Sequence, residues 1–322
     1  MKILLAPMEG VVDPVLRQLI TQMGGVDYCV TEFVRITSHL YPEKVFHKYC
    51  PELFTNSRTL AGTPVFVQIL GSDLTTMAEN AHKVAEMGAY GIDINFGCPA
   101  KTVNRHDGGA ALLKDPERVF QVTQAVRKAV PQDKPVTVKV RLGFSDKSFS
   151  NDIALAAEAG GGHWLTVHAR TKEEGYRPPA HWEYIAPMNE LIQIPVIANG
   201  DIWTPEDHKK CQQVSGCRDT MLGRGLVARP SLALEIKKQQ RLKLFSELKD
   251  FVIRFVELSE EHRNDQYAVQ RTKQLTKLMG RTYQEATELF DSIKRLRELP
   301  DVKSQIHSFF ERSPALEHSI ES

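Results

Sequence analysis

Short runs of apolar, often β-branched residues alternate with amphipathic stretches from residue 2 to about residue 240. This alternation is typical of repeated βα units around a parallel sheet, because each buried strand needs a helix to cover it. The predicted strands are 2–8, 28–34, 64–70, 91–96, 135–142, 164–170, 195–201 and 219–223, and the clearest helices between them are 74–87, 117–130, 151–159 and 205–214. Eight such strands favour an α/β fold of the closed (β/α)8 TIM-barrel type over an open sheet.

The pattern changes after Pro230. No further β-rich run follows, and residues 243–312 are predicted to form several helices, with Gly280 and Pro300 between them. A barrel of this type takes about 250 residues, so a chain of 322 residues has room for one barrel and a small appendage. We therefore expect a catalytic barrel domain at 1–240 and an all-helical domain at 241–322.

Polar residues interrupt the predicted strands at one parity. Strand side chains alternate between two faces with period two, and the strands of a parallel barrel are normally apolar at both parities. Five strands instead carry polar residues at matching parity, and their ends point the same way with Gln68, Asn95, Lys139, His168 and Asn199. A single strand-end residue of this kind is usually a solvated rim residue. Five together predict a shared site at the barrel mouth, where enzymes of this fold keep their active sites.

Glycine-containing turns follow the last two predicted strands, Asn-Gly-Asp at 199–201 and Gly-Arg-Gly at 223–225. Backbone N–H groups in such turns approach phosphate oxygens closely, and this is the recurrent phosphate site of the barrel fold, although a tight turn is the simpler interpretation. Gln68 and Lys139 would suit the pyrimidine edge of a flavin. Lys139 could alternatively form a Schiff base, as in an aldolase.

Composition narrows the possible chemistry. The net charge of +1 means that any binding of nucleic acid must depend on a local basic patch. Five cysteines show no CxxC pair and no Cys/His metal spacing, which argues against a zinc site and a disulfide framework. No apolar run approaches the roughly 20 residues of a membrane span, and the N-terminus lacks a secretory core. We expect a cytoplasmic monomer that binds neither membrane nor metal.

Cys98 stands out among the cysteines because it directly follows the fourth predicted strand, in Asn-Phe-Gly-Cys-Pro at 95–99. A thiol at that position could donate a proton to a carbon centre, and its ionisation would respond to nearby cations. The other four cysteines are expected to be buried and structural.

At this point the chain resembles the tRNA-dihydrouridine synthases along almost its whole length. The resemblance rests on ordered motifs at the predicted strand ends: APMEGVVD at 6–13, QILGSD at 68–73, DINFGCPAKTV at 93–103, KVRLG at 139–143, HARTKEEGY at 168–176, ANGDI at 198–202 and LGRG at 222–225. TEFVR at 31–35 and YQEATELF at 283–290 are most similar to the bacterial C-type subgroup, which acts on uridine 16 of the D-loop.

The resemblance implies an enzyme that reduces uridine in tRNA to 5,6-dihydrouridine with FMN, using NADPH as reductant. Hydride would pass to C6 of the uracil while Cys98 protonates C5, and Asn95 and Arg141 would contact the base or its surroundings. The residues implied to hold FMN are Pro7, Met8, Glu9, Gln68, Lys139, His168, Asn199, Gly200, Asp201, Gly223 and Arg224.

Residues 266–281 form the basic patch that a neutral chain needs for RNA. They contain Arg271, Lys273, Lys277 and Arg281 and no acid, and the last three would line one face of a helix. Arg271 lies where an apolar side chain is expected, so we predict that it points into the cleft between the helical region and the barrel and contacts RNA. The resemblance implies that this segment, with Arg35 and Tyr176, orients the tRNA.

Two other functions remain open from the sequence. The first is an FMN-dependent barrel oxidoreductase that acts on a free pyrimidine, which would not need the basic helical extension. The second is a tRNA-binding module whose barrel has lost catalysis, against which the intact Cys98 and Lys139 argue.

Overall fold

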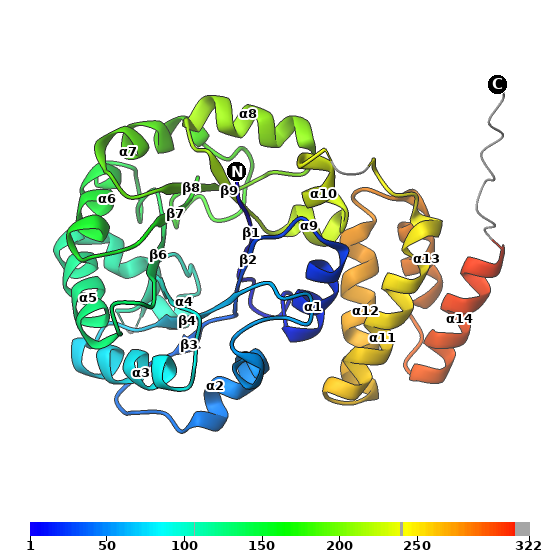
Figure 1. Cartoon of the computed structure of the whole chain (residues 1–322). Helices are drawn as coiled ribbons and strands as arrows, with labels where there is room; N and C mark the ends of the chain where they lie inside the picture. Colours follow the sequence, from blue (N-terminus) through cyan, green and yellow to red (C-terminus); the bar gives the residue numbers. More distant parts are fainter. Residues whose placement is uncertain (106, 239–240, 313–322) are drawn as a thin grey trace. The chain divides into compact units, whose positions relative to one another are not determined.

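The computed structural model describes residues 1–105, 107–238 and 241–312, and the chain divides into two compact units, Met1–Gly223 and Arg224–Ser322. Figure 1 traces both units along the sequence. Within the described residues, no helix is long and apolar enough to cross a lipid bilayer. The predicted domain boundary at 240/241 stays a prediction, and the last ten residues of the predicted helical domain lie outside the described ones.

The first unit is a closed barrel of parallel strands. The strands are β1 Ile3–Leu5, β2 Tyr28–Val30, β3 Val34–Arg35, β4 Val65–Leu70, β5 Ile92–Asn95, β6 Val136–Arg141, β7 Leu165–His168, β8 Val196–Asn199 and β9 Asp219–Leu222. Each pairs in parallel with its neighbours, β1 pairs with both β2 and β9, and the pairing of β2 with β4 closes the ring. The predicted TIM barrel is confirmed.

The predicted strand at 28–34 is divided into β2 and β3, and both pieces pair with β4. The interruption lies at Thr31, whose side chain bonds to β4. The N–H of Gln68 donates to the Thr31 hydroxyl at 3.0 Å, so a side chain replaces a backbone acceptor in the ladder at this point.

Helices cover the outside of the barrel. They are α1 Pro14–Met23, α2 Glu43–Tyr49, α3 Leu74–Glu86, α5 Pro116–Ala129, α6 Ser150–Ala159, α7 Ile185–Leu191 and α8 Pro205–Ser215. The short helix α4 Lys101–Asn104 lies in the loop after β5, and 3-10 turns lie at Pro51–Thr55, Gly109–Lys114 and Trp182–Tyr184. The four helices predicted from the sequence are confirmed to within two residues. Three of their starts are set by N-caps: Asp73, Asp115 and Thr204 accept backbone N–H groups in the first turns of α3, α5 and α8.

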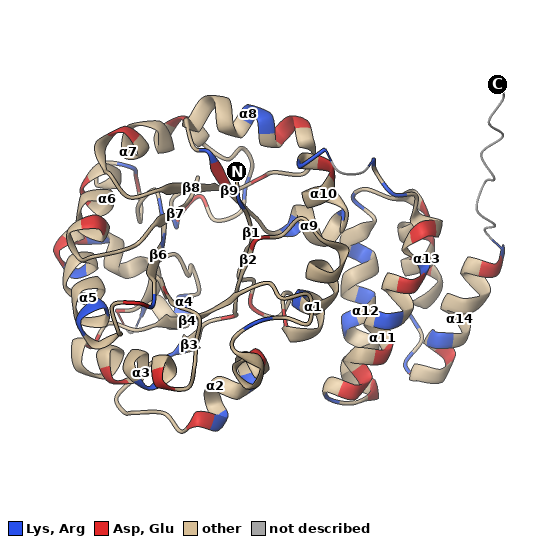
Figure 2. Ribbon diagram, in the orientation of Figure 1, with Lys and Arg blue, Asp and Glu red and all other residues tan. Residues whose placement is uncertain are grey.

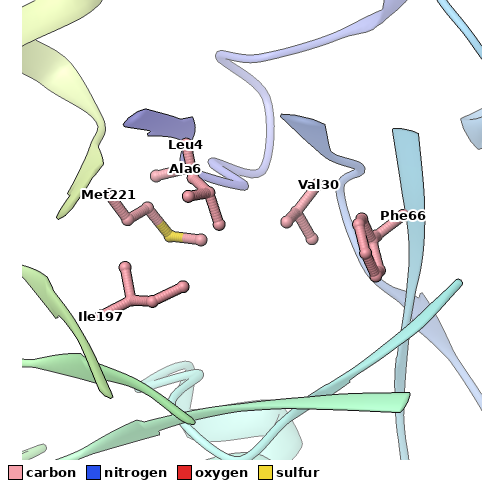
Figure 3. Close-up of a cluster of buried hydrophobic side chains, with 6 residues drawn as sticks. All are labelled: Leu4, Ala6, Val30, Phe66, Ile197 and Met221. Atoms are coloured by element: carbon pink, nitrogen blue, oxygen red, sulfur yellow. The ribbon is translucent and has the colours of Figure 1, made fainter. Parts of the chain in front are cut away.

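The interior of the barrel divides into an apolar part and a polar part. The apolar cluster consists of Leu4, Ala6, Val30, Phe66, Ile197 and Met221, which converge from β1 and the residue after it, β2, β4, β8 and β9 (Figure 3). Tyr28, Tyr90 and Trp164 pack against it. Phe66 and Ile197 lie two residues before Gln68 and Asn199 on the same faces of their strands, so apolar side chains fill the barrel below the polar residues at its carboxyl end.

All elements of the second unit, within the described residues, are helices or 3-10 turns. Its helices are α9 Arg224–Ala228, α10 Leu232–Ile236, α11 Lys249–His262, α12 Asp265–Met279, α13 Gln284–Ile293 and α14 Leu299–Arg312, with a 3-10 turn at Phe245–Leu248. Gly280 caps α12 as predicted. Pro300 is the second residue of α14, where proline's missing N–H has no intrahelical partner to lose, so it marks a helix start.

Candidate active site

The structure brings the polar strand-end residues together at the carboxyl ends of the strands. The Lys139 ammonium donates to Asn199 Oδ1 at 3.3 Å, and Asn95 Nδ2 donates to Gln68 Oε1 at 2.8 Å. Asn95 is in register with Lys139, and His168 is in register with Asn199. The five side chains singled out by their parity therefore share one face of the barrel wall.

A buried acid lies beneath this group. Asp93 is fully buried, and its carboxylate accepts from Gln68 Nε2 at 2.7 Å and from the Thr137 hydroxyl at 2.6 Å. Burial raises the pKa of Asp93 to about 6, against the opposing effect of these donors and of Lys139. Burial and then Arg141 lower the pKa of Lys139 to about 8, while Asp93 works in the other direction. The charge on Lys139 is therefore sensitive to its surroundings near physiological pH.

The backbone before and at Cys98 is fixed by four hydrogen bonds. The Gly97 N–H donates to Asn95 Oδ1 at 2.8 Å, and the Gly97 carbonyl accepts from Arg141 Nε at 2.7 Å. The Cys98 carbonyl accepts from Asn104 Nδ2 at 2.9 Å and from the N–H of residue 110 at 3.2 Å. The thiol is thus presented by a segment with little freedom, on the loop that follows β5.

The Cys98 side chain is 7% exposed, and its surroundings favour the protonated thiol. Burial is the largest cause of a raised pKa for Cys98, and Glu9 adds to it. The Ala100 N–H, Arg141 and Arg35 act in the opposite direction. A thiol in this environment holds its proton at neutral pH, as a proton donor must. The two arginines would stabilise the thiolate that remains after the proton has left.

The turn after β8 is held in an unusual conformation. Gly200 has a φ of +126° and Asp201 a φ of +48°, both in the region that favours glycine. Trp182 Nε1 donates to the Gly200 carbonyl at 2.8 Å, and the fully buried Arg170 forms an ion pair with Asp201. Strained backbone that is supported on several sides is characteristic of functional sites. Trp182 was missed in the sequence because it is 18 residues from the turn.

The turn after β9 packs closely against the segment after β1. A Cβ added at Gly223 would lie 3.1 Å from Met8 Sδ and 3.5 Å from the Ala6 Cβ, so glycine permits the close approach. Pro7 and Met8 are partly buried and Glu9 is exposed. Arg224 is the first residue of α9 and belongs to the second unit; its contact with a phosphate stays a prediction.

Arg141 is anchored to the backbone by its donors. Besides Gly97, its Nη1 donates to the carbonyl of Thr171 at 3.1 Å and to that of Gly175 at 2.8 Å. Its guanidinium carbon lies 5.2 Å from the centre of the Tyr176 ring, which is exposed and 6.0 Å from the ring of His168. Arg141 therefore ties the Cys98 loop to the loop after β7. A contact of Arg141 or Tyr176 with the base stays a prediction, as does the role of the partly buried Arg35.

In the helical unit, α12 carries Arg271, Lys273 and Lys277, and Figure 2 shows bands of Lys and Arg along it. Arg281 lies beyond the end of α12, after Gly280, so the prediction that it lines one helix face with Lys273 and Lys277 is wrong. Arg271 is 7% exposed, lies 5.5 Å from the Phe255 ring centre and hydrogen-bonds Gln274. Its burial beside an aromatic ring agrees with the apolar position expected for it, and its orientation into a cleft between the helical region and the barrel stays a prediction. Lys273 donates to the Leu296 carbonyl, whereas Lys277 is exposed. Contact of these residues with RNA stays a prediction.

All five cysteines are free and buried. Among the residues that the structure describes, no group of three or more His, Cys, Asp or Glu side chains could hold a metal ion.

A family model described as dihydrouridine synthase matches residues 4–320. The curated "tRNA-dihydrouridine(16) synthase" of Aquipseudomonas alcaligenes is 48% identical over 300 residues, which cover 92% of this chain and 95% of that protein. The protein of the same name from Escherichia coli O157:H7 is 43% identical over 309 residues, 96% of this chain and 98% of that one. Among solved structures, a 2-naphthoyl-CoA reductase in complex with 2-naphthoyl-CoA matches 74% of this chain with a TM-score of 0.57. At 12% identity and with half of that reductase covered, this match shows the fold alone.

Proposed function

Because the chain belongs to the dihydrouridine synthase family, we propose that it reduces a uridine of tRNA to 5,6-dihydrouridine, and that the uridine is at position 16 in the D-loop. One structural observation carries the proposal: a covered, protonated thiol, Cys98, follows the strand whose end contributes Asn95 to the polar group around Lys139. A proton donor beside a polar, partly buried site is what addition of hydrogen across a conjugated double bond requires.

The residues at the barrel mouth fit FMN. The Thr166 hydroxyl is fully buried in register with Lys139 and has no hydrogen-bond partner among the described residues, as expected where a polar ligand completes the site. Lys139 and Gln68 suit the pyrimidine edge of the ring, and the turns at 199–201 and 223 suit the phosphate. When bound and reduced by NADPH, FMN supplies the hydride that adds to C6 of the uracil.

Residues of the protein supply the proton and stabilise the thiolate that forms when the proton is transferred. Cys98 holds a proton on Sγ and transfers it to C5, which becomes saturated as C6 gains hydride. Arg141 and Arg35 favour the thiolate that is left. The uridine must leave its stack to reach a barrel mouth, at a cost of a few kcal/mol that is smallest in an irregular loop such as the D-loop.

The test is dihydrouridine formation on an unmodified tRNA transcript, with the modified position located by mass spectrometry of nuclease fragments. We expect one dihydrouridine at position 16 and a loss of about 10² to 10⁴-fold in the rate with Cys98→Ala, the range typical of a lost general acid. Cys211→Ala, which alters another buried thiol on α8, is the matched control and should retain activity. Reduction of free uracil but not of tRNA would favour the free-pyrimidine oxidoreductase, and undiminished activity of Cys98→Ala would remove the thiol from the mechanism.

A further inference from the structure

A chain of hydrogen bonds runs from the buried interior of the barrel to the residue before Cys98. Gln68 Nε2 donates to Asp93 Oδ2 at 2.7 Å, Asn95 Nδ2 donates to Gln68 Oε1 at 2.8 Å, and the Gly97 N–H donates to Asn95 Oδ1 at 2.8 Å. Asp93 and Gln68 are fully buried, so water does not compete for their bonds.

The two ends of this chain fix its direction. An ionised carboxylate can only accept, and a backbone N–H can only donate, whereas a side-chain amide offers an acceptor on one side and donors on the other. With Asp93 at one end and Gly97 at the other, the amides of Gln68 and Asn95 have a single arrangement in which every group is paired. Without the acceptor at Asp93, either amide could turn over and leave the Gly97 N–H facing another donor.

Gly97 is held on its other side as well, because its carbonyl accepts from Arg141 Nε at 2.7 Å. Both polar groups of the residue that precedes Cys98 are therefore anchored. We propose that Asp93 is a positioning residue, which sets the direction of the Gln68 and Asn95 amides and through them the place of the Cys98 thiol. The catalytic meaning of this role rests on the proposed function, but the positioning itself does not.

Asp93 could instead serve only as a counter-charge for Lys139, and two substitutions separate these roles. In Asp93→Asn the charge is lost, but the new carbonyl can still accept from Gln68 if its NH2 group donates to the Thr137 hydroxyl. In Asp93→Leu both the charge and the acceptor are lost. Thr137→Val is the matched control, because the Thr137 hydroxyl contacts the other carboxylate oxygen, Oδ1, and lies outside the chain that leads to Gly97.

The experiment measures the rate at which iodoacetamide alkylates Cys98 in the purified full-length protein without tRNA, by mass spectrometry of the peptide that carries it. We expect Asp93→Leu to change this rate by about tenfold or more, because a buried donor is left unpaired. The alkylation rate should remain within about threefold of the wild type in Asp93→Asn and within about twofold in Thr137→Val, because both variants keep an acceptor for Gln68 Nε2. With tRNA, Asp93→Leu should lower kcat by a similar factor while KM stays nearly constant.

A wild-type alkylation rate in folded Asp93→Leu would overturn the proposal, and so would an Asp93→Asn variant as impaired as Asp93→Leu, since the charge alone would then matter. If Asp93→Leu does not fold, Gln68→Met interrupts the same chain one link nearer to Gly97 and must change the Cys98 rate in the same way. A wild-type protein that makes no dihydrouridine but shows this alkylation pattern would refute the proposed function and leave the positioning role intact.

Discussion

Arg141→Met is expected to slow uridine reduction by about two orders of magnitude while leaving the affinity for tRNA nearly unchanged. Arg141 is 2% exposed and donates to three carbonyl groups, those of Gly97, Thr171 and Gly175, at 2.7, 3.1 and 2.8 Å. Methionine keeps most of the apolar stem and removes every donor. The substitution therefore removes the hydrogen bonds that link the Cys98 loop to the loop after β7, without opening a large cavity.

The magnitude follows from these three bonds. Hydrogen bonds to a charged group contribute roughly 1.5–3 kcal/mol each. Water can replace the lost donor at the partly buried carbonyls of Gly97 and Gly175, but not easily at the buried carbonyl of Thr171. We therefore expect the variant to lose about 3 kcal/mol of hydrogen-bond energy in total. Most of this is the cost of leaving the Thr171 carbonyl unpaired, and the rest is a smaller loss at the other two carbonyls. If this loss falls on the reacting geometry, a tenfold change for every 1.36 kcal/mol gives about a hundredfold decrease in kcat.

The assay is single-turnover reduction of a tRNA transcript by the flavin-reduced enzyme, with the dissociation constant for tRNA measured separately by filter binding. Arg177→Met is the control, because Arg177 lies in the same loop but is exposed. A hundredfold weaker affinity with an unchanged rate for bound tRNA would refute the role of Arg141 in holding the Cys98 loop against the loop after β7. It would show that the guanidinium contacts the base or its surroundings in the RNA, as the family resemblance implies.

Four further outcomes are expected. Arg17→Met breaks a buried, bidentate ion pair with Glu52 and should lower the free energy of urea unfolding by about 3–5 kcal/mol, and the double variant with Glu52→Leu should regain most of it. Gly200→Ala forces a methyl group onto a φ of +126°, at a cost of about 1–3 kcal/mol, and should weaken FMN binding in a fluorescence titration; unchanged affinity would contradict the role of this turn. The pKa of Lys139 is about 8 and its cation is the useful form, so the reduction rate at subsaturating FMN should fall as the pH rises through about 8, and a flat profile to pH 9 would exclude that role. Lys277→Ala should reduce the dependence of tRNA affinity on the logarithm of salt concentration by about one unit, whereas an unchanged slope would identify a solvated helix face.

The barrel and the composition of its mouth could be predicted because both depend on local patterns. Alternation within a single strand shows which residues share a face, and Gln68, Asn95, Lys139 and Asn199 do contact one another in pairs. The break between β2 and β3 could not be predicted, because it depends on the Thr31 hydroxyl taking a bond from a strand 37 residues away.

The roles of several buried polar residues also could not be predicted, because their partners are far away in the sequence. Arg17 lies on α1 among apolar residues, and only the fold shows that Glu52 neutralises it. Trp182 and Arg170 support the turn at Gly200 and Asp201 from separate segments of the chain. In each case the sequence shows the residue type, but its function depends on a partner that only the folded chain brings near.

The charges at the barrel mouth explain why rate and ligand affinity should share one pH dependence. Burial lowers the pKa of Lys139 to about 8 and raises that of Asp93 to about 6, and each group favours the charged form of the other. Arg141 opposes the charge on Lys139, so the protein stabilises this ammonium only in part. A ligand that places acceptor oxygens or negative charge beside Lys139 would raise its pKa, and by linkage the protonated lysine must bind that ligand more tightly. The affinity for an anionic ligand should therefore weaken as the pH rises above about 8, and the rate at subsaturating ligand should decline with it.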